Sequence, residues 1–439
     1  MSRQVTTTLN VFLNSRLVGY YSKGRKGEKT FSYAQPWLNE PKAIPLSRSL
    51  PLSDKTYAGD VVSFYFENLL PDSQEILIKI AERTGAAGRD AYNLLYEIGR
   101  DCVGALQFLP DAEVVVELEL PRGKVLSEAD IVSILDNLGR APLGVNQDGG
   151  FRISLAGAQE KAAFLRLGDK WLEPKGLSPT THIFKPDIGV LRWESGDVDF
   201  TQSVANEYYC LKLLKYFLPE VATAEMMCFG KKDVLVVERF DRLELNDGVI
   251  IRLPQEDMCQ ALGYPPTRKY QNDGGPKLVD ILKLLAFSDT PAKDQMSVFK
   301  CQILFWLIGA PDGHAKNFSI YLTPENSFRL TPIYDVMSAQ PAFDAKQIQH
   351  KDYRLAMPVG HNKHYKIKNI RGRHFVETAI EAGLSKGFAQ DAIKSIRDDF
   401  KAAFENVLND LTDGFPMHIH NCIKSAAEKR LPLLESAFE

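Results

Sequence analysis

The chain has 439 residues, of which 44% are hydrophobic and 25% are charged, and its formal net charge is -3. This length allows two or three domains with large cores. The slightly acidic balance excludes a protein whose whole surface clamps nucleic acid, so any DNA contact must come from a local patch or from a partner.

Cysteines and apolar runs indicate the compartment. The six cysteines are scattered without Cys-x-x-Cys pairs, and most stand in apolar runs. This pattern favours buried thiols in a reducing cytosol over a disulfide framework or a zinc site. The start, MSRQVTTTLNVFLNS, has no apolar core of signal-peptide length, and nowhere do about 18 uncharged apolar residues run together. We therefore expect a cytoplasmic protein without a membrane span.

Residues 1–110 are expected to form a small α+β module. Alternating apolar residues predict strands, and apolar residues at helical spacing predict helices. The expected strands are 9–13, 17–21, 30–33 and 105–109, and the expected helices are 58–70, 76–84 and 91–98. The module contains no recognisable chemistry.

Residues 111–255 have the pattern of a nucleotide-binding small lobe. A helix over 127–138 begins at Ser127, whose hydroxyl suits an N-cap. A second helix is expected over 206–217. The expected strands are 113–118, 151–155, 161–166, 170–173 and 182–185, followed by a hairpin of 225–229 and 234–240.

Residues 256–439 are expected to form a mainly helical domain. Its helices are predicted at 278–286, 294–308, 376–382, 392–408 and 422–434. The expected interruptions are the segment 307–335 and the stretch 341–373.

The segment 307–335, LIGAPDGHAKNFSIYLTPENSFRLTPIYD, carries the candidate chemistry. An apolar run is followed by a turn that contains Asp312, and Asn317 follows five residues later. Asp335 stands after two further apolar segments. A protein kinase uses this order, in which one carboxylate orients the attacking hydroxyl while an Asn and a second Asp hold the metal ions. Such residues are also common in ordinary turns, and Asp312 lacks a preceding His-Arg.

A loop and a lysine upstream could serve the phosphates of a nucleotide. The loop 155–161, LAGAQEK, has small residues that would let its backbone approach a ligand, although alone it is typical of a tight turn between strands. Lys185 ends an apolar strand, where a kinase places its phosphate-pairing lysine. Glu207, on the following helix, is a candidate carboxylate partner for Lys185, but a helix Glu is usually a surface residue.

Three further features have an ordinary and a functional interpretation. Glu238, Arg239 and Phe240 follow an apolar strand, as a hinge between lobes or an edge strand would. Ser154 is an ordinary strand hydroxyl. The run 365–374, YKIKNIRGRH, is the most compact basic patch in this half of the chain, through Lys366, Lys368, Arg371 and Arg373. It is either a solvated loop or a phosphate-binding surface.

Seven segments together resemble the HipA family, the serine/threonine kinase toxins of bacterial type II toxin–antitoxin pairs. The segments follow the family order over nearly the whole chain: FRISLAGAQEK at 151–161, THIFK at 181–185, NEYYC at 206–210, ERFDR at 238–242, RLPQEDMCQALG at 252–263, GAPDGHAKNFS at 309–319 and TPIYD at 331–335. The resemblance implies an α+β, two-lobed kinase-like fold resembling the phosphatidylinositol kinases.

The resemblance also implies roles for residues. Asp312 would be catalytic, Asn317 and Asp335 would bind Mg²⁺, and Ser154 would be autophosphorylated, which shuts the kinase down. A phosphate there would repel the phosphates of ATP and displace the loop. The ATP-binding residues would be Leu155, Ala156, Gly157, Ala158, Gln159, Glu160, Lys161, Lys185, Glu238, Arg239, Phe240, His314, Ala315, Lys316, Asn317, Tyr334 and Asp335.

The implied function is an ATP- and Mg²⁺-dependent serine/threonine protein kinase. As in the family, it would phosphorylate a translation component, glutamyl-tRNA synthetase in the best-studied members, and promote growth arrest and persistence. A small helix-turn-helix antitoxin of the HipB type would neutralise it, and the complex would act as co-repressor on operator DNA. The alternatives are a catalytically weak binding module that acts as co-repressor, and a small-molecule or lipid kinase.

Overall fold

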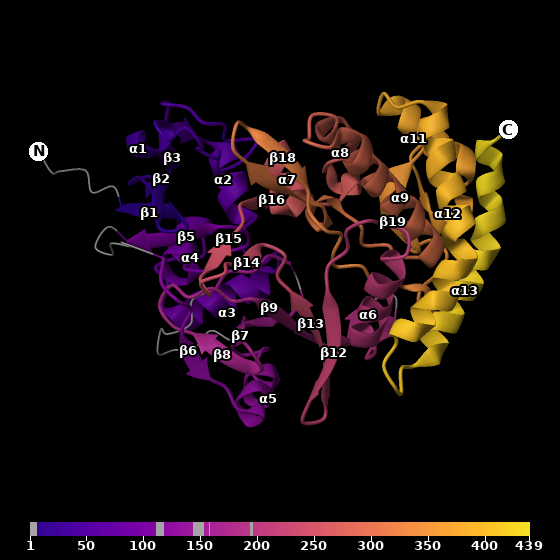
Figure 1. Ribbon diagram of the computed structural model, residues 1–439, viewed down its shortest axis with the longest axis horizontal. Coiled ribbons are helices and arrows are strands. Elements are labelled where there is room, and N and C mark those ends of the chain that lie inside the picture. The colour runs from indigo at the N-terminus through magenta and orange to yellow at the C-terminus, as the bar shows by residue number, and fades with distance from the viewer. Residues whose placement is uncertain (1–6, 111–117, 144–152, 158, 194–195) are drawn as a thin grey trace, which may run out of the picture.

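A computed structural model describes residues 7–110, 118–143, 153–157, 159–193 and 196–439. Its N-terminal elements lie at one end of the molecule and helices α11, α12 and α13 at the other (Figure 1). Within the described ranges, no helix combines the length and the apolar character that crossing a bilayer requires. The predicted strand 113–118 falls almost entirely outside the described residues.

The N-terminal module is a five-stranded antiparallel sheet covered by helices. The strand order is β4-β3-β2-β1-β5. The strands are β1 (Thr7–Leu13), β2 (Arg16–Lys23), β3 (Lys29–Tyr33), β4 (Tyr57–Ala58) and β5 (Leu106–Pro110), and the helices are α1 (Gln35–Leu38), α2 (Asp60–Glu67), α3 (Gln74–Thr84) and α4 (Ala91–Ile98). Its core contains stacked aromatic rings, such as Tyr21 on Phe66 with centroids 3.8 Å apart.

A six-stranded sheet, in the order β12-β13-β9-β7-β8-β6, forms the small lobe. Its strands are β6 (Gly123–Val125), β7 (Ala162–Leu167), β8 (Lys170–Pro174), β9 (His182–Pro186), β12 (Ala224–Phe229) and β13 (Lys232–Glu238). The flanking elements are α5 (Glu128–Asp136), the hairpin β10 (Gly189–Trp193) and β11 (Gly196–Phe200), and α6 (Ser203–Leu214). Ser127 caps α5 as predicted, through a capping box with Asp130.

The expected strand 151–155 is wrong for the residues described there. Ile153 forms only an isolated bridge with Asp101, and Leu155 belongs to no strand. Both side chains are buried in the core of the N-terminal module. The alternating pattern therefore reflects packing against that module and not a place in the small-lobe sheet.

The remaining chain forms a mainly helical lobe with small antiparallel sheets. The helices are α7 (Met258–Leu262), α8 (Leu278–Leu285), α9 (Pro291–Ile308), α10 (Gln340–Asp344), α11 (Gly372–Glu381), α12 (Lys386–Asn406) and α13 (Met417–Arg430). The strands are β14 (Arg242–Glu244), β15 (Ile250–Arg252), β16 (Gln255–Asp257), β17 (Ser319–Thr323), β18 (Ser327–Leu330), β19 (Arg354–Val359) and β20 (His364–Lys366). The stretch 341–373, expected to lack helix, contains most of α10 and begins α11.

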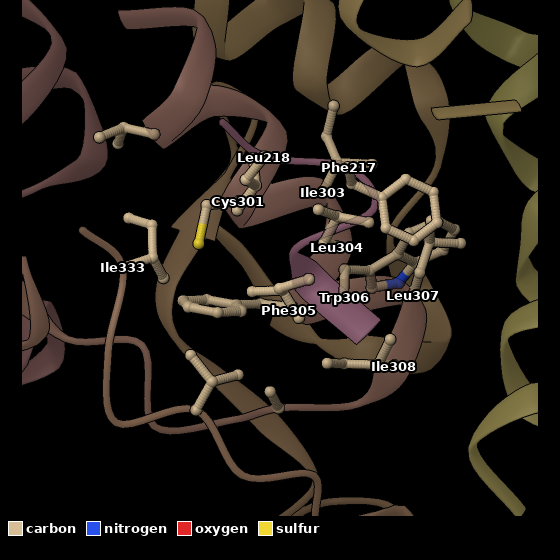
Figure 2. Packing of buried hydrophobic residues seen from close by; sticks show 14 of the residues in the cluster. Phe217, Leu218, Cys301, Ile303, Leu304, Phe305, Trp306, Leu307, Ile308 and Ile333 are labelled. Carbon is tan, nitrogen blue, oxygen red and sulfur yellow. The ribbon is translucent and has the colours of Figure 1, made fainter. Parts of the chain in front are cut away.

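Helix α9 is the centre of this lobe, because every residue from 297 to 308 is buried. Its large side chains pack against residues from several other segments, including Phe217 and Ile333 (Figure 2). The polar side chains are paired: Gln302 donates to the Met357 carbonyl at 2.7 Å, and the Trp306 indole donates to the Ile367 carbonyl at 2.9 Å. A helix fixed on all sides holds the loop that follows it in one place.

A buried network of charges joins the N-terminal module to the end of β13. Asp101 accepts hydrogen bonds from Arg242 and Arg252, both at 2.9 Å, and pairs with Arg239 at 3.3 Å. Asp241 accepts from the Gly104 amide at 2.7 Å. Burial alone would raise the pKa of Asp101, but the three arginines outweigh it and hold that pKa well below its usual range.

The six cysteines are free thiols, and four of them are buried as predicted. Cys228 is exposed and Cys422 is half-buried, contrary to the expectation. Both stand where the apolar pattern belongs to one face of an amphipathic element, β12 and α13 respectively.

Replacing Asp101 with Asn should strongly destabilise the protein. The change keeps the shape but leaves three buried guanidinium groups short of a negative charge, which costs about 3–5 kcal/mol when a buried pair is broken. The matched control is Asp136→Asn, which removes an exposed partner of Lys232 and should cost at most about 1 kcal/mol. Urea unfolding measures both, and equal costs would contradict the structural role of Asp101.

Urea unfolding of the parent and of Asp101→Asn at several pH values tests the acid dependence of stability. The native pKa of Asp101 is depressed, so its contribution is complete above its unfolded pKa of about 3.9 and is lost as the pH falls below that value. The difference in unfolding free energy between the parent and Asp101→Asn should therefore shrink in acid.

Candidate active site

Asp312 stands in the loop that follows the end of α9. Gly309 ends the helix with a φ of +70°, and a Cβ there would meet the Tyr353 hydroxyl at 1.8 Å, so the position requires glycine. The side chain of Asp312 is 60% exposed, whereas Asn317 is buried. The Asn317 amide donates to the Asp312 carbonyl at 2.9 Å, which closes the loop and brings the two predicted residues together.

Lys185 lies between two carboxylates from distant segments. Its Nζ is 2.8 Å from Oε1 of Glu207 on α6 and 2.7 Å from Oδ1 of Asp335. The lysine comes from β9, in the middle of the small-lobe sheet. A lysine on a central strand paired with a helix glutamate is the arrangement of an active protein kinase. The predicted contact between Lys185 and Glu207 is confirmed.

Burial and the neighbouring charges shift the pKa of each member of this triad. Burial alone would lower the pKa of Lys185, but Asp335 and Glu207 outweigh it and raise that pKa. For Asp335, burial is outweighed by Lys185 and then Lys161, so the pKa of its carboxyl is depressed. The pKa of Glu207 is raised, first by burial. Asp335 is therefore ionised at neutral pH.

Asn317 and Asp335 have the oxygen atoms that a divalent cation needs. The Asn317 amide nitrogen is bound to the protein, which leaves its oxygen as the free donor atom. Asp335 has a φ of +58°, its side chain is 43% exposed, and Lys185 contacts only Oδ1. No group of three His, Cys, Asp or Glu with metal-binding geometry occurs in the described ranges. The two residues fit Mg²⁺ that takes its other ligands from nucleotide and water.

In the segment after β13, Phe240 and Arg239 have different surroundings. Phe240 lies beside Tyr334 with ring centroids 5.4 Å apart, and Tyr334 donates to the Lys316 carbonyl at 2.8 Å. Arg239 is different, because its side chain belongs to the network around Asp101, its amide donates to Thr181 and its carbonyl accepts from Arg242. Arg239 therefore joins the lobe to the N-terminal module, while an adenine contact stays a prediction for Glu238, Phe240 and Tyr334.

The glycine-containing loop lies against the N-terminal module. Gly157 has a φ of +105°, and its carbonyl accepts from the Asp72 amide at 3.2 Å. Leu155 packs into the module's core, so only its backbone could face a nucleotide. Lys161 is buried and donates to the Ala156 carbonyl. Burial and then Lys185 lower the pKa of Lys161 to about 8. Ala158 lies outside the described residues.

The other predicted loop residues are placed unevenly. Gln159 donates to the Pro186 carbonyl at 3.1 Å, and Glu160 is exposed. His314 is buried, with Nε2 3.9 Å from Oδ2 of Asp312, and Ala315 is buried beside it. Lys316 instead turns to the N-terminal module, where its ammonium pairs with Asp72 at 3.1 Å. That ammonium is bound to Asp72 and Asn68 of the N-terminal module and not to the group around Lys185, so a contact with ATP is not supported for it.

Ser154 is fully buried. Its hydroxyl donates to the Leu69 carbonyl at 2.7 Å, and its amide donates to the Asp101 carbonyl at 2.9 Å. The hydroxyl therefore cannot meet a phosphate donor unless residues 153–157 leave the N-terminal module.

Two of the four basic side chains in the run 365–374 are partly covered by the protein itself. The Arg371 guanidinium donates to the carbonyls of Lys368 and Ile370, at 2.9 and 2.7 Å, and Lys366 is half-buried. Lys368 and Arg373 are the exposed members. The patch that could meet DNA is therefore smaller than the sequence suggested.

Two contributors were missed in the sequence. Asp72, from the module expected to lack chemistry, pairs with Lys269 at 2.8 Å and with Lys316. Tyr270 donates to Oδ1 of Asp312 at 2.7 Å. Neither follows a periodic pattern, and the only local signal is the turn sequence Asp273-Gly274-Gly275 after Tyr270.

Comparisons with known proteins identify the family of the chain. A sequence profile of the HipA-like C-terminal domain matches residues 153–405, and one of the HipA N-terminal domain matches residues 9–109. The chain is 34% identical over 411 residues to Y4mE of Sinorhizobium fredii, a protein named as a kinase. The alignment covers 92% of this chain and 93% of that relative. It is 27% identical over 361 residues to the serine/threonine-protein kinase toxin HipA of Shewanella oneidensis. That alignment covers 79% of this chain and 78% of the relative.

A solved structure shares the fold. It is the complex of HipA, HipB and operator DNA from Shewanella oneidensis, matched with a TM-score of 0.80 and 22% identity over 98% of this chain and 99% of that chain. The two-lobed kinase-like architecture is confirmed, while the likeness to phosphatidylinositol kinases stays a prediction. With both domains of the family matched in order and two relatives named as kinases, this chain is a kinase of the HipA family.

Proposed function

We propose that the protein is an ATP- and Mg²⁺-dependent serine/threonine protein kinase that acts as the toxin of a type II toxin–antitoxin pair. The observation that carries the proposal is the position of Lys185 between Glu207 and Asp335. Asp312 and Asn317 stand on one loop, closed by their own hydrogen bond. This combination supports a cleft that receives the phosphates of ATP.

Each residue has a task in the proposed reaction. Asp312 accepts the proton of the attacking serine or threonine hydroxyl as that oxygen bonds to the γ-phosphorus. Lys185 and Lys161 hold the phosphates by charge. Mg²⁺, held by Asn317 and Asp335, would neutralise charge on the phosphate oxygens. Phe240 and Tyr334 supply aromatic surface for the adenine.

The partners are proposed from the relatives. The solved complex contains HipA, HipB and operator DNA, so we propose a HipB-type antitoxin and operator binding through that complex. The protein substrate is proposed to be a translation component, glutamyl-tRNA synthetase, because the best-studied members of the family act on it.

Autophosphorylation of Ser154 is proposed as the off-switch. A phosphate carries about -1.5 to -2 charges and cannot stay in the apolar site that now holds the hydroxyl. The segment 153–157 would therefore leave the N-terminal module and take Gly157 with it, which would dismantle the phosphate-covering loop.

The rival is a binding module that serves only as co-repressor. The intact triad and the exposed carboxylate of Asp312 disfavour it, since antitoxin binding alone needs none of them.

Replacement of Asp312 by Asn should separate the two functions. Fold and ATP binding should persist, while phosphotransfer should fall by roughly 10²–10⁴-fold, the contribution of general base catalysis. Growth arrest on expression should stop, whereas antitoxin binding and operator repression should remain.

The control is Asp136→Asn, an exposed acid on α5, which should keep every activity. If Asp312→Asn stays as toxic as the parent, the kinase reaction is not the source of toxicity and the binding-module reading takes its place.

The metal prediction concerns Asp335. Asp335→Ala should weaken ATP binding in magnesium far more than in EDTA, because the carboxylate acts through the cation. Calorimetric titration in both buffers measures the difference. An equal loss in both would mean that the substitution disturbs the fold and not a metal site.

The self-label should depend on Ser154. Ser154→Ala removes the acceptor and one buried hydrogen bond, so the bulk of labelling from [γ-³²P]ATP should vanish while transfer to other proteins persists. Ser133→Ala, on α5, is the control. A label that survives in Ser154→Ala would move autophosphorylation to another residue.

A further inference from the structure

The loop 264–277, between α7 and α8, lies against the loop 309–317 that carries Asp312 and Asn317, here called the catalytic loop. The Ala315 amide donates to the Lys269 carbonyl at 3.4 Å, and the ring of Tyr270 meets that of His314 edge-on at 5.0 Å. The loop closes on itself through the Gly275 amide, which donates to the Tyr270 carbonyl. A Cβ on Gly275 would come within 1.9 Å of the Arg268 carbonyl oxygen, so the closure requires glycine.

Tyr270 restrains a carboxylate that is otherwise free to turn. Its hydroxyl donates to Oδ1 of Asp312 at 2.7 Å. The His314 side chain also lies near this carboxylate, with Nε2 3.9 Å from Oδ2. Burial lowers the pKa of His314, so the imidazole is neutral at pH 7 and exerts little pull. An aspartate that is 60% exposed would sample several rotamers without the phenol.

Asp72 of the N-terminal module fixes the position of this phenol. Its Oδ2 pairs with Lys269 at 2.8 Å, directly before Tyr270, and its Oδ1 pairs with Lys316 at 3.1 Å. The Asp72 amide also donates to the Gly157 carbonyl. One buried residue therefore connects the loop of Tyr270, the catalytic loop and the glycine-containing loop.

We propose that Tyr270 is a positioning residue for phosphotransfer: its phenol holds Asp312 with Oδ2 turned to the attacking hydroxyl, and Asp72 fixes the phenol through Lys269. The inference rests on the proposed kinase function. In the step itself the substrate oxygen bonds to the γ-phosphorus, the bond from that phosphorus to the β–γ bridging oxygen breaks, ADP leaves with the electron pair, and the hydroxyl proton passes to Asp312.

Tyr270→Phe tests the inference in steady-state phosphotransfer with saturating protein acceptor. Loss of orientation should lower kcat by roughly 10–100-fold, the scale of a small misplacement of a catalytic group. The KM for ATP should stay near the parent value, because the phenol touches the base and not the nucleotide. Tyr96→Phe, an exposed tyrosine on α4, is the matched control and should leave both constants unchanged.

A double substitution separates positioning from a general structural effect. In an Asp312→Asn background, Tyr270→Phe should cause no further loss, because its effect passes through the carboxylate. Lys269→Met should lower kcat in the same direction as Tyr270→Phe. If thermal melting shows that Tyr270→Phe is unfolded, Lys269→Met takes its place in the comparison with the Asp312→Asn background.

The outcomes are distinct. The inference would be overturned if Tyr270→Phe had the same kcat as the parent. It would also be overturned if Tyr270→Phe lowered kcat by the same factor in the parent and in the Asp312→Asn background. The kinase function would stand in both cases. Absence of phosphotransfer in the parent itself would overturn the proposed function and this inference with it.

Discussion

The ammonium of Lys185 is the interaction on which the site depends. It joins the small-lobe sheet, helix α6 and the segment after β18 through Glu207 and Asp335, at 2.8 and 2.7 Å. Removing either carboxylate would leave the buried ammonium with one negative partner in place of two, so the pairing holds the three segments in one arrangement. The backbone of Asp335 has a φ of +58°, which non-glycine residues adopt rarely and mostly at constrained or functional positions.

The N-terminal module is part of the site and not an appendage. Asp101 binds three arginines: Arg239 directly after β13, Arg242 at the start of β14 and Arg252 at the end of β15. Asp72 neutralises two lysines beside the catalytic loop. Ser154 is buried against the same module. These contacts are charged or hydrogen-bonded and largely buried, so a shift of the module would move the glycine-containing loop and the catalytic loop together.

Sequence periodicity was sufficient for most of the elements. The apolar spacing placed α4, α8 and α9 within a few residues of their observed ends, and the order of Asp312, Asn317 and Asp335 indicated the chemistry. The pairing of Lys185 with Glu207 could be suggested but not decided, because it needs a helix and a strand to pack. Tyr270 and Asp72 were out of reach, since loop residues that act through tertiary contacts leave no pattern in the chain. The expected strand at 151–155 failed for a related reason: alternation records burial, and here the burying partner was a different module.

The fate of the γ-phosphate tests the central claim most directly. The purified protein is incubated with [γ-³²P]ATP and a bacterial lysate, and the labelled products are separated and hydrolysed to amino acids. The account predicts label on phosphoserine or phosphothreonine of a protein other than the kinase. Label confined to inorganic phosphate, to a lipid or to a small molecule would contradict it.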